Sequence, residues 1–325
     1  MDGLDITVVS GPDPAVVDEI LALLHRSARA TGHAAISEHK RMELVRRPDT
    51  SGPGTTPPPA RLVAGVLARL PQVADLIGYA HVGGDPAVRD YAVELTVDPG
   101  ADGAPAIADA LLGASVDQVK ALGGGNLRLW QSQAAAADDA RASAHGFHLE
   151  RNLIQMRCPL PLPRPDPAAG SAPGIPIATR PFRPGGDEEA WLATNNRAFA
   201  SHPEQGHWDL ATLLEHESEP WFDPEGFLLL EEGGRLVGSC WTKIHASTDP
   251  PLGEIYVIGV DPEFHGRGWG RALTLAGLDW LAGRGLRVGM LYVDADNRAA
   301  VSMYRSMGFA EDHVDRAYVT TVDPA

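Results

Sequence analysis

The chain has 325 residues, of which 44% are hydrophobic and 22% charged, a composition typical of a globular protein with a sizeable core. At roughly 150 residues per domain, this length predicts two domains. The 27 basic and 43 acidic side chains give a net charge of −16, which argues against general binding to nucleic acid or to an anionic membrane. Two cysteines, Cys158 and Cys240, are too few for a disulfide framework, so we expect a reducing compartment, the cytoplasm.

The sequence shows no sign of membrane insertion. It has no run of about 18 apolar residues, the length that a membrane-spanning helix needs. Its first ten residues, MDGLDITVVS, are acidic and lack the basic and apolar segments of a signal peptide. We therefore expect no membrane partner.

A proline-rich segment divides the chain near its middle. Residues 159–174 read PLPLPRPDPAAGSAPG, and closely spaced prolines favour an extended polyproline path. Such a segment is a semi-rigid linker and not part of a core. It predicts an N-terminal domain of residues 1–158 and a C-terminal domain of residues 175–325.

The two predicted domains share landmarks in the same order. Glu94 lies 16 residues after Gly78, and Glu254 lies 16 residues after Gly238. Both glutamates open β-rich runs that end in Asp-Pro, and a Gly-Phe pair follows later in each half. Each half reads as a strand, two helices, several strands, a helix, a strand, a helix and a strand. This order predicts an α+β fold of two related domains, each a largely antiparallel mixed sheet flanked by helices.

The strongest chemical signal is a glycine-rich loop after the strand that ends at Asp261-Pro262. It reads HGRGWG at residues 265–270 and opens a helix. Glycines let backbone N–H groups face a ligand, and the helix N-terminus adds partial positive charge, so the loop can bind a pyrophosphate. Arg267 and Arg271 add local positive charge. A Walker A loop is excluded because no Gly-Lys-Ser/Thr occurs, and Asp279 does not fit the acidic position of a Rossmann fingerprint.

This loop resembles the phosphate loop of the GNAT acyltransferase superfamily, Gln/Arg-x-x-Gly-x-Gly/Ala, with His265 as its departure. The later run from Asp296 to Phe309 resembles the second half of GNAT domains. The resemblance implies that acetyl-CoA is the co-substrate and that its pantetheine arm lies along the strand containing Ile258. The implied cofactor-binding residues are Ile258, Gly259, Val260, His265, Gly266, Arg267, Gly268, Trp269, Gly270, Arg271, Asn297, Arg298, Ala299, Ala300, Val301 and Ser302.

Several short motifs of the second half resemble, more narrowly, those of the mycothiol synthase family. They are HPEQG at 202–206, WFDP at 221–224, WTK at 241–243, LGEIYV at 252–257 and LYV at 291–293. This resemblance covers most of residues 180–320 and implies acetylation of the cysteinyl amine of a cysteinyl-glucosaminyl-inositol. The implied acceptor-binding residues are Glu38, Glu204, Lys243, Glu254 and Tyr292.

Two residues are the predicted acid–base pair. Glu254 begins the strand beside the cofactor, and we expect it to act as general base on the amine. Tyr304 precedes Gly308-Phe309 on a helix, and we expect it to protonate the leaving thiolate. The alternatives are a solvated glutamate at a strand end and a tyrosine of the core. Cys240 fits a small core residue better than a nucleophile.

The first half departs from the family pattern. After Val97-Asp98-Pro99 it reads GADGAPAIADAL, in which Pro105 lacks an N–H and Asp102 brings negative charge. We expect this half to be catalytically silent and to complete the acceptor pocket, for instance through Glu38.

Two other functions stay open at this point: a GNAT enzyme for another amine, such as an aminoglycoside or a protein N-terminus, and a non-catalytic acyl-CoA sensor. We expect a monomer without a metal.

Overall fold

The computed structural model describes residues 3–11, 13–45, 61–162, 177–200, 206–246 and 248–325. They form two compact units, residues 1–153 with 313–325 and residues 154–312. These units differ from the domains expected from the proline-rich linker, because residues 154–158 group with the second half and residues 313–325 with the first. Most of the predicted linker, from residue 163 on, lies outside the described residues.

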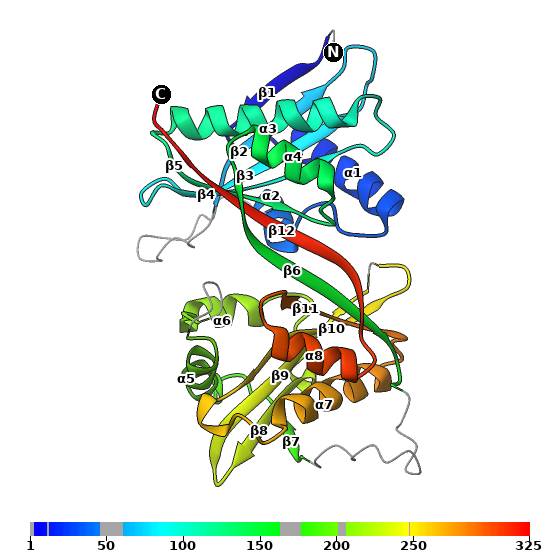
Figure 1. Ribbon diagram of the computed structural model, residues 1–325, viewed down its shortest axis with the longest axis vertical. Coiled ribbons are helices and arrows are strands. Elements are labelled where there is room, and N and C mark those ends of the chain that lie inside the picture. The colour runs from blue at the N-terminus through cyan, green and yellow to red at the C-terminus, as the bar shows by residue number, and fades with distance from the viewer. Residues whose placement is uncertain (1–2, 12, 46–60, 163–176, 201–205, 247) are drawn as a thin grey trace. The chain divides into compact units, whose positions relative to one another are not determined.

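The first unit is built on a mixed sheet with the strand order β1-β2-β3-β4-β5-β12 (Figure 1). Of the described pairs in this order, only that of β4 with β5 is parallel, and β12 joins through residues 316–322. The elements are β1 (Asp5–Val9), α1 (Pro14–Thr31), α2 (Glu38–Val45), β2 (Arg61–Arg69), β3 (Gly78–Asp85), β4 (Asp90–Val97), α3 (Ala104–Ala121), β5 (Gly125–Gln131), α4 (Ala136–Ala144), β6 (His148–Pro159) and β12 (Ala310–Val322).

Two apolar clusters fill the two faces of this first sheet. Helix α3 buries Ile107 and Leu111 against β2, β3 and β4 on one face. Helices α1 and α2 bury Leu23 and Leu44 on the other. Helix α1 begins where the Asp13 side chain accepts the Val16 N–H at 3.0 Å, a typical N-cap.

The second unit has its own mixed sheet with the order β11-β10-β9-β8-β7 (Figure 1). Among the strand pairs that the structure describes in this order, only that of β10 with β11 is parallel. The elements are β7 (Thr179–Pro181), α5 (Glu188–Ala198), α6 (Leu210–Glu217), β8 (Phe227–Glu232), β9 (Arg235–His245), β10 (Leu252–Val260), α7 (Trp269–Gly283), β11 (Val288–Asp294) and α8 (Arg298–Ser306), with 3-10 turns at Pro224–Gly226 and Pro262–Phe264. The mixed, largely antiparallel sheets and flanking helices confirm the predicted α+β class.

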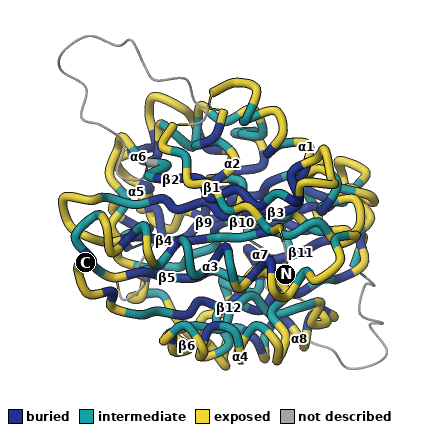
Figure 2. The backbone as a smooth tube through the Cα atoms, turned by 90° about the horizontal axis from the view of Figure 1, so that it is seen from above, coloured by how far each residue is buried: buried dark blue, intermediate teal, exposed yellow. Residues whose placement is uncertain are grey.

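The side chains of β9 alternate between the two faces of this second sheet, and the strand is buried from Leu236 to Lys243. Figure 2 colours the backbone by burial. Trp241 packs with Trp191 of α5 on one face. Cys240 lies on the other face against α7, so close that a Cβ at Gly277 would be 2.5 Å from its sulfur. Within the described part of the chain, no helix is long and apolar enough to cross a membrane.

The strand registers align the two halves differently from the spacing of their sequences. Gly78 pairs with Val97 and Gly238 pairs with Val260, and each valine directly precedes Asp-Pro. Counting from these pairs, the facing residues Lys243 and Glu254 correspond to Gly83 and Ala92 of the first half. The expected match of Glu94 with Glu254 is therefore wrong. A β-bulge between Ile255 and Val257 adds a residue to β10, and equal spacing in sequence conceals this irregularity.

Candidate active site

The site of the second unit begins where β10 and β11 diverge. The two parallel strands pair from Leu252–Val288 to Ile255–Leu291, and both continue beyond that pair, β10 to Val260 and β11 to Asp294. The β-bulge lies directly after the last pair. Past this point the edge of β10 that faced β11 is free of the ladder, so its backbone groups can bind an extended ligand.

The glycine loop lies at the end of β10 and opens α7, as predicted. Gly266 and Gly268 both have φ of 78°, a left-handed conformation that side chains disfavour. The first N–H groups of α7 have no partner within the helix and can bind an anion. Arg267 pairs with Glu232 at 3.1 Å, and Arg271 donates to Ser306 Oγ at 2.9 Å. Both partners of the Arg267 pair are half-exposed, so a phosphate can replace Glu232 at little cost.

The departure at His265 has a structural counterpart. Its Nε2 lies 3.0 Å from the carbonyl oxygen of Val260, within hydrogen-bond distance. The histidine thus connects the glycine loop to the end of β10. This role differs from that of a residue binding phosphate through its side chain.

Helix α8 provides the second predicted cofactor segment. Asn297 caps this helix, since its Oδ1 accepts the N–H of Ala300 at 3.1 Å. Three of the predicted residues, Arg298, Val301 and Ser302, line a surface hollow. Its remaining lining consists of Ile154, Ala295 and Arg305.

Glu254 is buried at the start of β10, with 6% of its surface exposed. Lys243 of β9 faces it directly in the antiparallel register. His245 lies two residues further along β9, and its Nε2 is 2.7 Å from Glu254 Oε2. The carboxylate is thus held by the sheet and by an imidazole, which excludes the alternative of a solvated glutamate at a strand end.

Lys243 is buried against aromatic rings. Its Nζ lies 4.2 Å from the Trp221 ring centre and 5.2 Å from that of Tyr256. Cation–π attraction of this kind stabilises a desolvated ammonium. Trp221 and Tyr256 also contact the buried Trp241. The WFDP and WTK motifs thus contribute to one aromatic wall, formed by these three rings.

Tyr292 projects to the same face of the sheet as Glu254. Met290 pairs with Glu254, and Tyr292 is two residues further along β11, so alternation places it on that face. The Tyr292 phenol accepts a hydrogen bond from Gln155 Nε2 at 2.7 Å, and 38% of the residue is exposed. It is therefore available to a ligand.

Tyr304 approaches the sheet from the α7 side. It is 6% exposed, and burial, with a smaller effect of the nearby Cys240, raises the pKa of its phenol. The phenol therefore keeps its proton at neutral pH, as a general acid requires. Cys240 is fully buried, and burial raises its thiol pKa to about 12, which supports its assignment to the core.

Two predicted acceptor residues lie outside the described part of the second unit. Glu38 is the first residue of α2 in the first unit, and Glu204 lies outside the described residues. Conversely, the contact of His245 with Glu254 was not predicted. The sequence signal for this contact was the i, i+2 spacing of Lys243 and His245, which places both side chains on one face of the strand.

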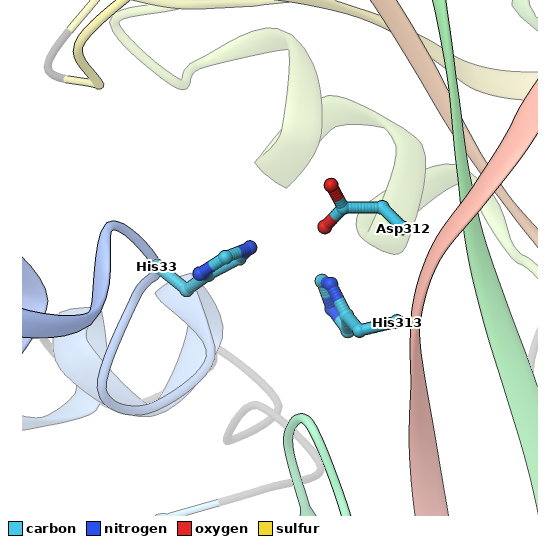
Figure 3. A group of neighbouring side chains, drawn as sticks. All are labelled: His33, Asp312 and His313. Carbon is cyan, nitrogen blue, oxygen red and sulfur yellow. The ribbon is translucent and has the colours of Figure 1, made fainter.

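The first unit contains a histidine contact that no sequence spacing indicates. The rings of His33 and His313 meet edge to face with their centres 4.7 Å apart, and Asp312 precedes His313 in the chain (Figure 3). His33 Nδ1 also lies 2.9 Å from the Thr31 carbonyl oxygen. The contact fixes the loop after α1 against β12 within this unit.

Comparison with known proteins agrees with the GNAT resemblance. The acetyltransferase (GNAT) family model matches residues 189–309. A GCN5-related N-acetyltransferase from Sphaerobacter thermophilus has a TM-score of 0.71 at 23% identity, covering 100% of this chain and 98% of that one. A tandem GNAT protein from the clavulanic acid biosynthesis pathway has a TM-score of 0.65 at 18% identity, covering 99% of each chain. These two structures support the tandem fold.

Closer similarity is found among curated sequences. The mycothiol acetyltransferase of Streptomyces coelicolor is 41% identical over 311 residues, covering 94% of this chain and 92% of that protein. The mycothiol acetyltransferase of Thermobispora bispora is 50% identical over 230 residues, covering 69% and 74%. Because such identity extends over nearly its whole length, the chain belongs to the mycothiol acetyltransferase family of GNAT enzymes.

Proposed function

We propose that this enzyme transfers the acetyl group of acetyl-CoA to the cysteinyl amine of a cysteinyl-glucosaminyl-inositol, the last step of mycothiol synthesis. The observation that carries the proposal is the buried Glu254, which lies beside the point where β10 and β11 diverge. A carboxylate in this position can take a proton from an amine next to a thioester bound along β10. The relatives' shared name, mycothiol acetyltransferase, supports an acceptor that belongs to mycothiol synthesis.

Acetyl-CoA binds along the free edge of β10, with its pantetheine against residues 258–260. Its pyrophosphate lies on the N–H groups of the glycine loop, and its charge is offset by Arg267, Arg271 and the α7 N-terminus. The large negative net charge of the chain does not prevent acetyl-CoA from binding, because the phosphates lie next to this local positive charge. The segment from Asn297 to Ser302 completes the cofactor site.

The acceptor binds on the face that carries Glu254, Lys243 and Tyr292. Glu254 removes a proton from the ammonium, and the free amine attacks the thioester carbonyl. Lys243 and the Tyr292 phenol bind acceptor oxygens, and the aromatic wall excludes water from Lys243. A backbone N–H near Gly259 stabilises the developing oxyanion. Glu38 and Glu204 remain candidates for further contacts with the acceptor.

Tyr304 protonates the CoA thiolate from the opposite face. Glu254 and Tyr304 lie on different sides of the sheet, and the divergence of β10 and β11 opens the sheet between them. A thioester held in that opening is accessible to a base from one side and to an acid from the other. This arrangement supports two separate roles and requires no metal.

The first half is proposed to be catalytically silent. Gly83 and Ala92 replace Lys243 and Glu254, and Ala142, four residues before Gly146, replaces Tyr304, which is four before Gly308.

Its phosphate loop is altered as well. Gly103 and Gly268 are the left-handed caps of α3 and α7, and the residue before each cap is Asp102 in the first half but Arg267 in the second. Asp98 Oδ1 already accepts the Gly100 N–H at 3.0 Å. We therefore propose one strong acetyl-CoA site per chain, in a monomeric enzyme of the cytoplasm.

The test is acetylation by the purified protein. Product is followed by mass spectrometry, because the acceptor's own thiol interferes with thiol reagents. Formation of the N-acetyl product with the cysteinyl-glucosaminyl-inositol is expected. Preference for an aminoglycoside or a peptide N-terminus would identify a different GNAT enzyme, and tight acetyl-CoA binding without transfer to any amine would identify a sensor.

A further inference from the structure

The proposed reaction releases a proton that must leave a buried site. The acceptor ammonium carries three N–H hydrogens, and the product amide carries one. One of the two lost protons ends on the CoA sulfur. The other, taken by Glu254, has to reach solvent before the next turnover.

Glu254 is poorly placed to release this proton directly. Only 6% of the residue is exposed, and Lys243, which faces it, is also buried. The ammonium of a lysine has no lone pair and cannot accept a proton. Release therefore needs a neighbouring group that can both accept a proton and reach water.

His245 meets both conditions. Its Nε2 lies 2.7 Å from Glu254 Oε2, and 26% of its side chain is exposed. Imidazole accepts a proton on one nitrogen and releases one from the other near neutral pH. The residue is also fixed in place, because the Thr248 hydroxyl donates to the His245 carbonyl oxygen at 2.9 Å where β9 ends.

We propose that His245 is a positioning residue that carries the proton from Glu254 to solvent, an inference that rests on the proposed acetyl transfer. The ammonium gives a proton to the Glu254 carboxylate, and the amine nitrogen forms its bond to the thioester carbon. The C–S bond breaks, the thiolate takes the Tyr304 proton, and the attacking nitrogen's second proton restores the phenol. The Glu254 proton passes to His245 and then to water, which returns the site to its starting state.

A purely structural role for His245 predicts different behaviour. If the imidazole only held the Glu254 side chain by a hydrogen bond, then His245→Gln, which keeps a donor, would restore the rate. Free imidazole in the buffer would then have no effect on a variant lacking the ring. If His245 is a proton relay, His245→Gln should stay slow and free imidazole should raise the rate of a variant lacking the ring, because glutamine does not transfer protons and imidazole does.

The experiment compares wild type, His245→Ala and His245→Gln under saturating substrates, with and without added imidazole. We expect both variants to lose at least tenfold in kcat while KM for acetyl-CoA stays within twofold. Imidazole should raise kcat of His245→Ala in a saturable manner and leave wild type unchanged. His25→Ala, an exposed position on α1, is the control and should show neither effect.

Three results would overturn the relay: an unchanged kcat in His245→Ala, full activity in His245→Gln, or no response of His245→Ala to imidazole. If His245→Ala does not fold, the rate of His245→Gln and its dependence on buffer concentration decide the question. An inactive wild type would instead reject the proposed function, so the two failures are distinguishable.

Discussion

Replacing Glu254 by glutamine removes the proposed base with little change in shape. The amide keeps the side-chain length, so the packing between β9 and β10 and the contact with His245 can persist. What is lost is the negative charge and the ability to accept the proton of the ammonium. The variant therefore tests the chemistry of the carboxylate more directly than a truncation to alanine, which would leave a cavity.

The expected loss follows from the burial of Glu254. General base catalysis contributes about 10²- to 10⁴-fold, or about 2.7 to 5.4 kcal/mol of activation free energy. Since only 6% of Glu254 is exposed, water has little room to replace it, and we expect kcat to fall by about 10³-fold. KM for acetyl-CoA should stay within a factor of two, because the glycine loop and α7 are unchanged.

The assay is steady-state acetylation followed by mass spectrometry, with acetyl-CoA and acceptor varied in turn. Glu189→Gln provides a matched control, since Glu189 is an exposed glutamate at the start of α5. It should retain wild-type kcat. A kcat for Glu254→Gln within threefold of wild type would refute the assignment of Glu254 as base.

Three further predictions concern the acid, the packing and the pH dependence. Tyr304→Phe should lower kcat by about 100-fold in the same assay, and a full rate would exclude a role for the phenol. Gly277→Ala should lower the free energy of unfolding by about 1 kcal/mol in urea titrations, because overpacking against the cysteine sulfur of β9 exceeds the gain in helix propensity. Gly283→Ala is the control: this position has open space around it, so the substitution should cause no such loss. Burial and the neighbouring Glu188 raise the pKa of Glu217 to about 7, so the folded state holds this proton more tightly than the unfolded chain. The resulting stability is complete below pH 4.5 and is lost as pH rises through 7, so Glu217→Gln should raise Tm at pH 8 and not at pH 4.5; an equal Tm at pH 8 would contradict this.

Much of the second half could be predicted from local signals. The glycines at 266 and 268 have the left-handed φ that the loop requires, and Gly308 ends α8 as expected. These signals act through backbone conformation over a few residues, which a sequence shows directly. The relation between the two halves could also be predicted, because the same order of strands and helices occurs twice in the sequence.

The pairing across strands was not predictable in the same way. The bulge at Tyr256 shifts β10 by one residue, so Glu94 occupies a different register position from Glu254. The contact between His245 and Glu254 depends on that register and on the loop joining the strands. The exchange of residues 154–158 and 313–325 between the units likewise depends on tertiary contacts that no local pattern encodes.

The most direct test of the central claim is acetyl transfer to a cysteinyl-glucosaminyl-inositol by the purified chain. We expect an N-acetylated product that forms in proportion to CoA release, with a higher kcat/KM than for glucosamine, an aminoglycoside or a peptide amine. The product should form about 10³-fold more slowly with Glu254→Gln. A wild-type protein that binds acetyl-CoA and leaves this acceptor unmodified, or that acetylates another amine more efficiently, would contradict the account.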